Sequence, residues 1–144
     1  MRPERVPSWI LKYKRKVRNM RFWGIMLFVY GISSCFILSL ISGDIPYFTA
    51  LLLTIGLFES VFAVIFGFSM FVGARVKYIK VNEYYICHYV GWKNRLIIDE
   101  EEQDSSMMGK CYGTLPDGRE VTSGGVFGIH FEVYDPTTRR TRRF

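Results

Sequence analysis

Two long apolar segments in the first half of this 144-residue chain constrain its fold more than any other feature. Residues 22–41 contain no charged side chain, and residues 45–74 contain only Glu59. About 20 helical residues cross the hydrocarbon core of a bilayer, so both segments are long enough to do so. The alternative is a pair of core helices in a soluble bundle, but helices of that length would carry a charged face. We therefore expect a transmembrane helical hairpin over residues 22–74, with helices at 22–41 and 46–73.

Basic residues flank the outer ends of this hairpin. Residues 1–21 carry eight lysine or arginine residues against one acid, and three more basic residues follow at positions 75–80. The turn at 42–46 has no basic residue and one acid. The positive-inside rule then places both termini on the cytosolic or matrix side. The long basic lead argues against a cleaved signal peptide. A basic cluster beside a membrane segment is typical of lipid-headgroup contact, so we expect no nucleic-acid partner.

Residues 1–21 are expected to form a basic amphipathic segment at the membrane interface. Ile10, Tyr13 and Val17 follow helical spacing, and most of the basic residues lie elsewhere on the helical wheel. The arginine-rich, acid-poor composition is also typical of a mitochondrial targeting segment. The residues expected to contact lipid headgroups or an acidic partner are Lys12, Lys14, Arg15, Lys16 and Arg18.

Small residues recur at helical spacing in both apolar segments. Because lipid gives little hydrophobic drive between helices, small residues permit the close packing that holds helices together. A turn as short as 42–46 also requires the two helices to be antiparallel neighbours. The residues expected at the helix contact are Gly56, Ser60, Ala63 and Gly67 in the second segment, and Gly24 and Gly31 in the first.

Glu59 is the one acidic or basic residue within the second apolar segment. A charged side chain at the bilayer centre is costly, so an intramembrane carboxylate is expected to have a polar partner. Three alternatives are open. Glu59 is protonated and bonded to a backbone carbonyl or to Ser34 within the hairpin, or it contacts a polar or basic group on a neighbouring subunit, or it carries protons.

After residue 74 the pattern changes from helical spacing to alternation. Residues 75–135 are expected to form a small antiparallel sheet or partial barrel of about five or six strands, with a turn at Pro116-Asp117-Gly118. The last strand is predicted to direct Phe127, Ile129, Phe131 and Val133 inward and His130 outward. The acidic stretch 99–106 is predicted to be a solvated loop, or else a dock for a basic partner or a weak cation site. Residues 136–144 are predicted to be a basic tail that does not pack.

No motif for catalysis or for binding a nucleotide, haem or zinc is found in the sequence, so we expect neither an enzyme nor a cofactor. Cys87, His88, Cys111 and His130 match no established metal-ligand spacing, and we expect no metal site. The cysteines are expected to be free thiols, since Cys87 and Cys111 follow the basic, reducing side of the hairpin.

The predicted fold class is therefore membrane α+β. A hairpin followed by a β-domain on the same side is similar in layout to accessory and assembly subunits of membrane complexes, which is an architectural analogy. The function expected is a non-catalytic accessory or scaffold subunit, with other integral-membrane subunits and lipids as partners. The favoured location is the mitochondrial inner membrane, in a respiratory-chain or ATP-synthase-type assembly. The alternatives are an ER or Golgi regulatory subunit of a membrane enzyme or channel, and a proton or ion pathway component using Glu59.

Overall fold

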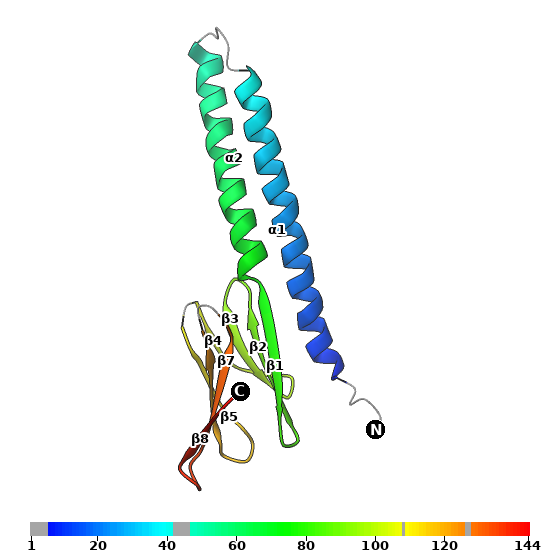
Figure 1. The fold of residues 1–144 in the computed structure, drawn as a ribbon, viewed down its shortest axis with the longest axis vertical. Helices are drawn as coiled ribbons and strands as arrows, with labels where there is room; N and C mark the ends of the chain where they lie inside the picture. The colour runs from blue at the N-terminus through cyan, green and yellow to red at the C-terminus, as the bar shows by residue number, and fades with distance from the viewer. Residues whose placement is uncertain (1–5, 42–46, 108, 126–127) are drawn as a thin grey trace. The chain divides into compact units, whose positions relative to one another are not determined.

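The computed structural model describes residues 6–41, 47–107, 109–125 and 128–144. In these residues two helices are followed by two antiparallel sheets, which confirms the α+β layout (Figure 1). The chain divides into two compact units, one of residues 1–17 with 74–144 and one of residues 18–73. The elements are α1 (Ser8–Ile41), α2 (Tyr47–Gly73), β1 (Arg75–Val81), β2 (Tyr84–Val90), β3 (Asn94–Ile98), β4 (Glu101–Ser106), β5 (Cys111–Thr114), β6 (Glu120–Gly124), β7 (His130–Asp135) and β8 (Arg140–Arg143).

Both helices are long and apolar enough to cross a membrane. Only 11% of the most apolar window of α1 and 17% of that of α2 is buried within the chain. A core helix of a soluble protein would be mostly buried, so the apolar surface of this hairpin is left uncovered by its own chain. The turn expected at 42–46 lies outside the described residues.

The two helices pack through the small residues that the sequence predicts, and all six of these residues lie at or beside the contact. A Cβ atom on Gly67 would lie 2.6 Å from the carbonyl oxygen of Gly24, and one on Gly31 would lie 2.7 Å from that of Ser60. Gly56 faces the Leu38 side chain, and Ala63 is 8% exposed. Any side chain at Gly24, Gly31 or Gly67 would push the helices apart, which explains why glycine is needed there.

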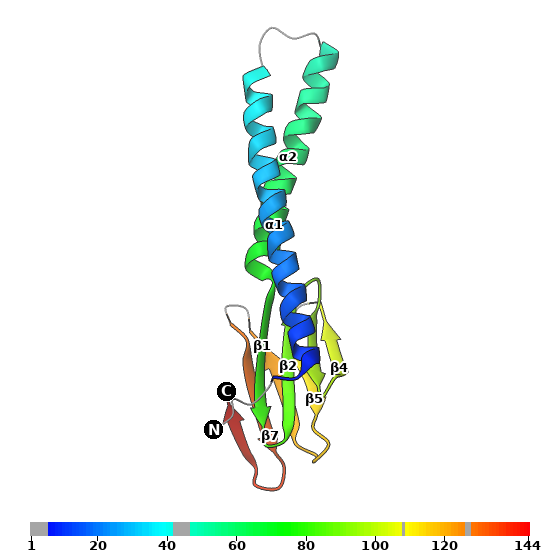
Figure 2. The ribbon, with the colours of Figure 1, turned by 90° about the vertical axis from the view of Figure 1, so that its right-hand side faces the viewer.

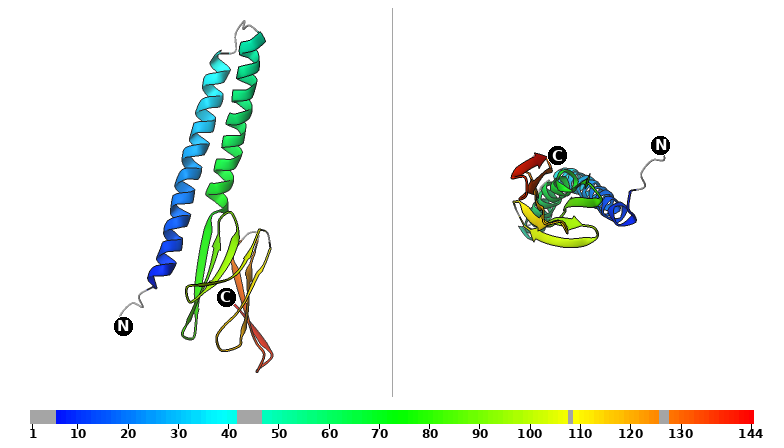
Figure 3. Two further views of the ribbon diagram at one scale, coloured as in Figure 1. Left: turned by 180° about the vertical axis from the view of Figure 1, so that it is seen from behind. Right: turned by 90° about the horizontal axis from the view of Figure 1, so that it is seen from below.

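The β-strands form two four-stranded meanders, β1-β2-β3-β4 (sheet A) and β5-β6-β7-β8 (sheet B). Their inner faces share one apolar core, which makes the domain a sandwich rather than a single sheet (Figures 2 and 3). Phe131 and Val133 of β7 are buried in this core and His130 is exposed, so the predicted phase of that strand is confirmed; Phe127 lies outside the described residues. The buried members of the core are Val81, Ile86, Leu96, Ile98, Cys111, Leu115, Val121, Ile129, Phe131 and Val133.

The first turns of α1 cover the other face of sheet A. The Tyr13 ring lies 5.4 Å from that of Tyr89, and the Lys14 ammonium lies 4.6 Å from the ring of Tyr78. Ile10 and Val17, on the same side of the helix, are 0% and 6% exposed. The predicted contact of residues 1–21 with a membrane interface stays a prediction, but this segment is not a separate element. The amphipathic spacing is present, but its apolar stripe packs on protein, and α1 continues unbroken to Ile41.

Two strands were not expected from the sequence. The acidic stretch predicted to be a loop contains β4, which pairs with β3, and the stretch predicted to be a tail contains β8, which pairs with β7. Sheet B therefore extends beyond residue 135, where the β-domain was expected to end. Both strands lie at sheet edges, where charged side chains are tolerated because one face or edge remains in water.

Candidate functional site

Glu59 lies near the middle of α2 and beside the helix contact. Ser60 is 2% exposed, and its hydroxyl donates a 2.7 Å hydrogen bond to the carbonyl oxygen of Gly56 in its own helix. Glu59 is about 70° around the helix from the centre of the small-residue stripe, and its side chain is exposed. It has no hydrogen bond to Ser34 or to any other described residue. The first alternative, a bond within the hairpin, therefore has no support in the structure.

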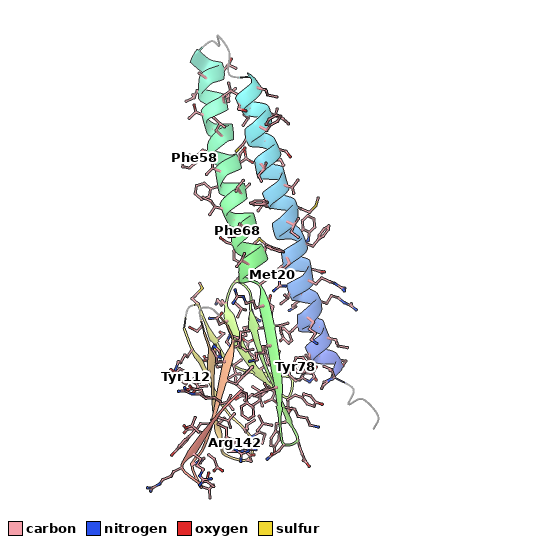
Figure 4. The ribbon with its side chains drawn as sticks, viewed as in Figure 1. Met20, Phe58, Phe68, Tyr78, Tyr112 and Arg142 are labelled. Atoms are coloured by element: carbon pink, nitrogen blue, oxygen red, sulfur yellow. The ribbon has the colours of Figure 1, made fainter. Side chains whose placement is uncertain are left out.

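The exposed surface around Glu59 is apolar. Phe58, Phe62 and Ile55 are 68%, 60% and 58% exposed, and the rings of Phe58 and Phe62 lie 5.4 Å apart. Figure 4 shows Phe58 on the side of α2 that faces away from α1. An exposed carboxylate thus stands at the edge of an uncovered aromatic surface, which is an unfavourable place for a charge unless a polar partner covers it.

The five basic residues expected to bind lipid or a partner are all exposed on α1. The Lys14 ammonium lies over the Tyr78 ring, and that of Lys16 lies 5.4 Å from the Tyr13 ring. Lys12, Arg15 and Arg18 lie on the exposed part of the helix surface, whereas Ile10 and Val17 are buried against the sheet. Contact of these residues with lipid or a partner stays a prediction.

A buried histidine–serine pair connects the two sheets, and sequence reasoning missed it. Nδ1 of His88 on β2 lies 2.7 Å from Oγ of Ser123 on β6. Each residue is 1% exposed, and burial lowers the pKa of His88 to about 4. The imidazole is therefore neutral at physiological pH and inaccessible to a substrate. The available signal was strand alternation, which places His88 on the same face as Ile86 and Val90.

The residues weighed as metal ligands do not converge. Cys87 faces the helix side of sheet A, His88 and Cys111 face the core, and His130 lies on the outer face of sheet B. Among the described residues, no group of three or more histidine, cysteine or acidic side chains is placed to hold a metal ion. Burial raises the pKa of the Cys87 thiol to about 12 and also raises that of Cys111, so both thiols are protonated and poorly nucleophilic.

His130 lines a shallow hollow of about 500 Å³ on the outer face of sheet B, together with Lys110, Glu132 and Arg143. Arg143 Nε donates a 2.9 Å hydrogen bond to Glu132, so two of these charges neutralise each other. His130 has no hydrogen bond to a described residue. The described part of this hollow therefore contains no coupled acid–base pair.

Comparison of the chain with protein-family models, with curated proteins and with solved structures finds no match. Its function must be inferred from its own residues. The feature that most strongly requires an external partner is the surface formed by Glu59, Ile55, Phe58 and Phe62, which we call the Glu59 face.

Proposed function

We propose that this chain is a non-catalytic scaffold subunit of a larger integral-membrane assembly, which it joins through the Glu59 face of α2. The observation that carries the proposal is an exposed carboxylate in the middle of an apolar helix whose opposing contact with α1 is already complete. A hairpin surrounded only by lipid would leave this carboxylate without a polar partner, which is costly.

The uncovered apolar surface supports insertion of the hairpin in a bilayer. Phe36, Leu40 and Ile65 are 65%, 72% and 61% exposed, and similar side chains cover both helices. Soluble monomers rarely expose contiguous apolar patches larger than a few hundred Å². Lipid chains would cover this surface along both helices without a protein partner on every side. A membrane is therefore the environment that we propose for the hairpin.

The partner of Glu59 is then a transmembrane segment of another protein. A carboxylate at the bilayer centre costs about 2.5–3.5 kcal/mol on insertion scales when it faces lipid. The small-residue stripe next to it is occupied by α1, so the polar partner comes from outside the chain. A hydroxyl, amide or basic group on a neighbouring helix would offset part of this cost, because interhelical hydrogen bonds in membranes contribute about 0.6–2 kcal/mol.

The compartment stays a prediction from composition. The arginine-rich start of the chain favours the mitochondrial inner membrane, and a respiratory-chain or ATP-synthase-type assembly is the class that we propose on that basis. Fractionation of tagged full-length protein tests this part separately, and recovery in the ER or Golgi would replace it with the regulatory-subunit alternative. A role in proton transfer would need further ionisable groups supplied by the partner.

Native electrophoresis of detergent-solubilised membranes, followed by mass spectrometry, tests the scaffold function. We expect Glu59→Leu to release the chain from its assembly, whereas Glu59→Gln keeps much of the assembly because an amide still forms a neutral hydrogen bond. Thr54→Leu is the matched control. Thr54 is exposed about 140° around the helix from Glu59, and its hydroxyl bonds to Ala50 in its own helix.

Normal assembly of Glu59→Leu would contradict the proposal. A fully assembled Glu59→Gln complex that has lost turnover would instead favour proton transfer through this residue. Both readings require activity to be normalised to the amount of assembled complex.

A further inference from the structure

A second hollow, of about 250 Å³, is lined by residues of both sheets at the end of the sandwich where β1 meets the turn after it. Three arginines line it, against one acid. Arg140 and Arg142 are exposed and Arg119 is half-buried, so the hollow is open to solvent and accessible to a soluble ligand. The polar lining residues are Asn82, Arg119, Asp135, Thr138, Arg140 and Arg142.

The register of β8 explains how two of the arginines reach this hollow. Arg142 pairs with Val133, which is 4% exposed and part of the core, and Arg140 pairs with Asp135. Paired residues of antiparallel strands share a face, and residues two apart on one strand also share it. Arg140 and Arg142 therefore continue the inner face of sheet B. Figure 4 labels Arg142 at the lower end of the domain, where the turns lie.

Arg119 is held in place by its neighbour Asp117. Its Nε donates a 2.8 Å hydrogen bond to Asp117 Oδ2, its Nη2 contacts the same oxygen, and its side chain is 17% exposed. These bonds raise the pKa of Arg119 and lower that of Asp117, so both remain charged. The guanidinium is thus preorganised at the wall of the hollow.

The positive charge of the hollow is not balanced within the described chain. Asp135 is the one acid that lines it, and its carboxylate accepts hydrogen bonds from the backbone N–H groups of Thr137 at 2.9 Å and Thr138 at 3.4 Å. The side chains of Arg140 and Arg142 form no hydrogen bond or ion pair with a described residue. Arg140 and Arg142 therefore bring two positive charges to the hollow against the single negative charge of Asp135.

We propose that this hollow binds a small phosphate-bearing anion. The planar guanidinium donates paired hydrogen bonds that match the oxygens of a phosphate group, and Asn82 and Thr138 add neutral donors. Sites for drug-sized ligands measure about 300–1,000 Å³, so a volume of about 250 Å³ suits inorganic phosphate or a small phosphomonoester rather than a dinucleotide.

A phosphate group can come from a free anion or from a lipid headgroup, and both share the chemistry that the arginines of this hollow recognise. Titration with free phosphate and with vesicles of phosphatidic acid distinguishes the two sources.

Binding of inorganic phosphate and of phenyl phosphate to the full chain in a neutral detergent, measured by isothermal titration calorimetry, tests the proposal. We expect Arg140→Gln and Arg142→Gln each to weaken binding about tenfold or more, since each removes a charge-assisted hydrogen-bond donor. Arg143→Gln is the matched control, because Arg143 lies on the same strand but outside this hollow and pairs with Glu132. It should change affinity less than about twofold.

Asp135→Asn provides a test with the opposite sign. The amide oxygen can still accept the bonds from Thr137 and Thr138, while the opposing charge is lost, so phosphate should bind more tightly. The proposal is overturned if the unchanged chain binds neither phosphate, or if Arg143→Gln weakens binding as much as Arg142→Gln. It is also overturned if binding occurs only to vesicles of phosphatidic acid and not to free phosphate. If the unchanged chain binds neither phosphate, the arginines serve only as charges that protect a sheet edge from pairing with other strands.

Discussion

Burial of His88 between the two sheets makes the stability of the β-domain depend on pH. In the folded chain the pKa of His88 is lowered by burial from its ordinary value of 6.5 to about 4. The unfolded chain therefore binds more protons between these two values, and the free energy of unfolding must rise with pH across this interval. The stabilisation is complete above about pH 6.5 and is lost as the pH falls to about 4.

We predict that this single group removes about 3 kcal/mol of stability between pH 6.5 and pH 4, since each pKa unit corresponds to about 1.4 kcal/mol. Chemical unfolding of the full chain at several pH values, followed by tryptophan fluorescence, measures the slope. His88→Gln keeps a hydrogen-bonding group near Ser123 but does not titrate, so its slope over this interval should be flatter. An unchanged slope in His88→Gln would show that His88 is not the cause.

At the scale of the element, the hairpin is held by backbone contact at glycines, and two glycines of α2 offer a matched test. A Cβ on Gly67 would lie 2.6 Å from Gly24 O, whereas one on Gly73 has no atom within 4 Å. We predict that Gly67→Ala destabilises the hairpin by about 1–3 kcal/mol through overpacking, and that Gly73→Ala does not. Thermal unfolding in detergent, followed by circular dichroism, measures both. A stable Gly67→Ala hairpin would mean that the helices do not pack at this contact.

The alternation of apolar and polar residues predicted six of the strands, and the spacing of small residues predicted the helix contact. Both patterns arise because one face of a strand or helix packs against another element. Strand β4 escaped prediction because it is acidic, which lowers strand propensity, and because its hairpin turn is Asp99-Glu100 rather than a glycine turn. Asp99 and Glu100 adopt φ values of 42° and 79°, and Asp99 accepts a 2.9 Å bond from the Tyr85 N–H. Strand β8 did carry a signal, the Asp135-Pro136 turn, but its arginines outweighed it.

The face of Glu59 could not be predicted from the sequence. At about 70° from the centre of the small-residue stripe, a side chain can turn toward either α1 or the outside, and helical periodicity does not choose between them. The hollow at Arg140 and Arg142 was missed for a related reason. The sequence does not show that Arg140 and Arg142 share the inner face of sheet B, because this follows only from the pairing of residues 140–143 with β7.

At the scale of the whole molecule, both ends of the chain belong to one compact unit, formed by residues 1–17 and 74–144. Contacts of Tyr13 with Tyr89 and of Lys14 with Tyr78 lie within this unit. If the hairpin of residues 18–73 crosses a membrane, we therefore expect the two ends to lie on the same side. The start of the chain thus has a structural reason, in addition to its basic charge, to share a side with the β-domain.

We predict equal protection of tags placed at the two ends when intact organelles or sealed vesicles are treated with protease. Opening the membrane should expose both tags together. If one tag is cleaved in sealed vesicles while the other is protected, the chain crosses the membrane an odd number of times and the hairpin topology is wrong.

Site-specific photo-crosslinking in native membranes tests whether the Glu59 face meets another membrane protein. Phe62 and Leu57 are 60% and 40% exposed, but they lie about 60° and about 160° around the helix from Glu59. A photoreactive residue at position 62 should form an adduct with a second integral-membrane protein, and one at position 57 should give little or none. An adduct of equal yield at both positions, or none at position 62, would contradict the account.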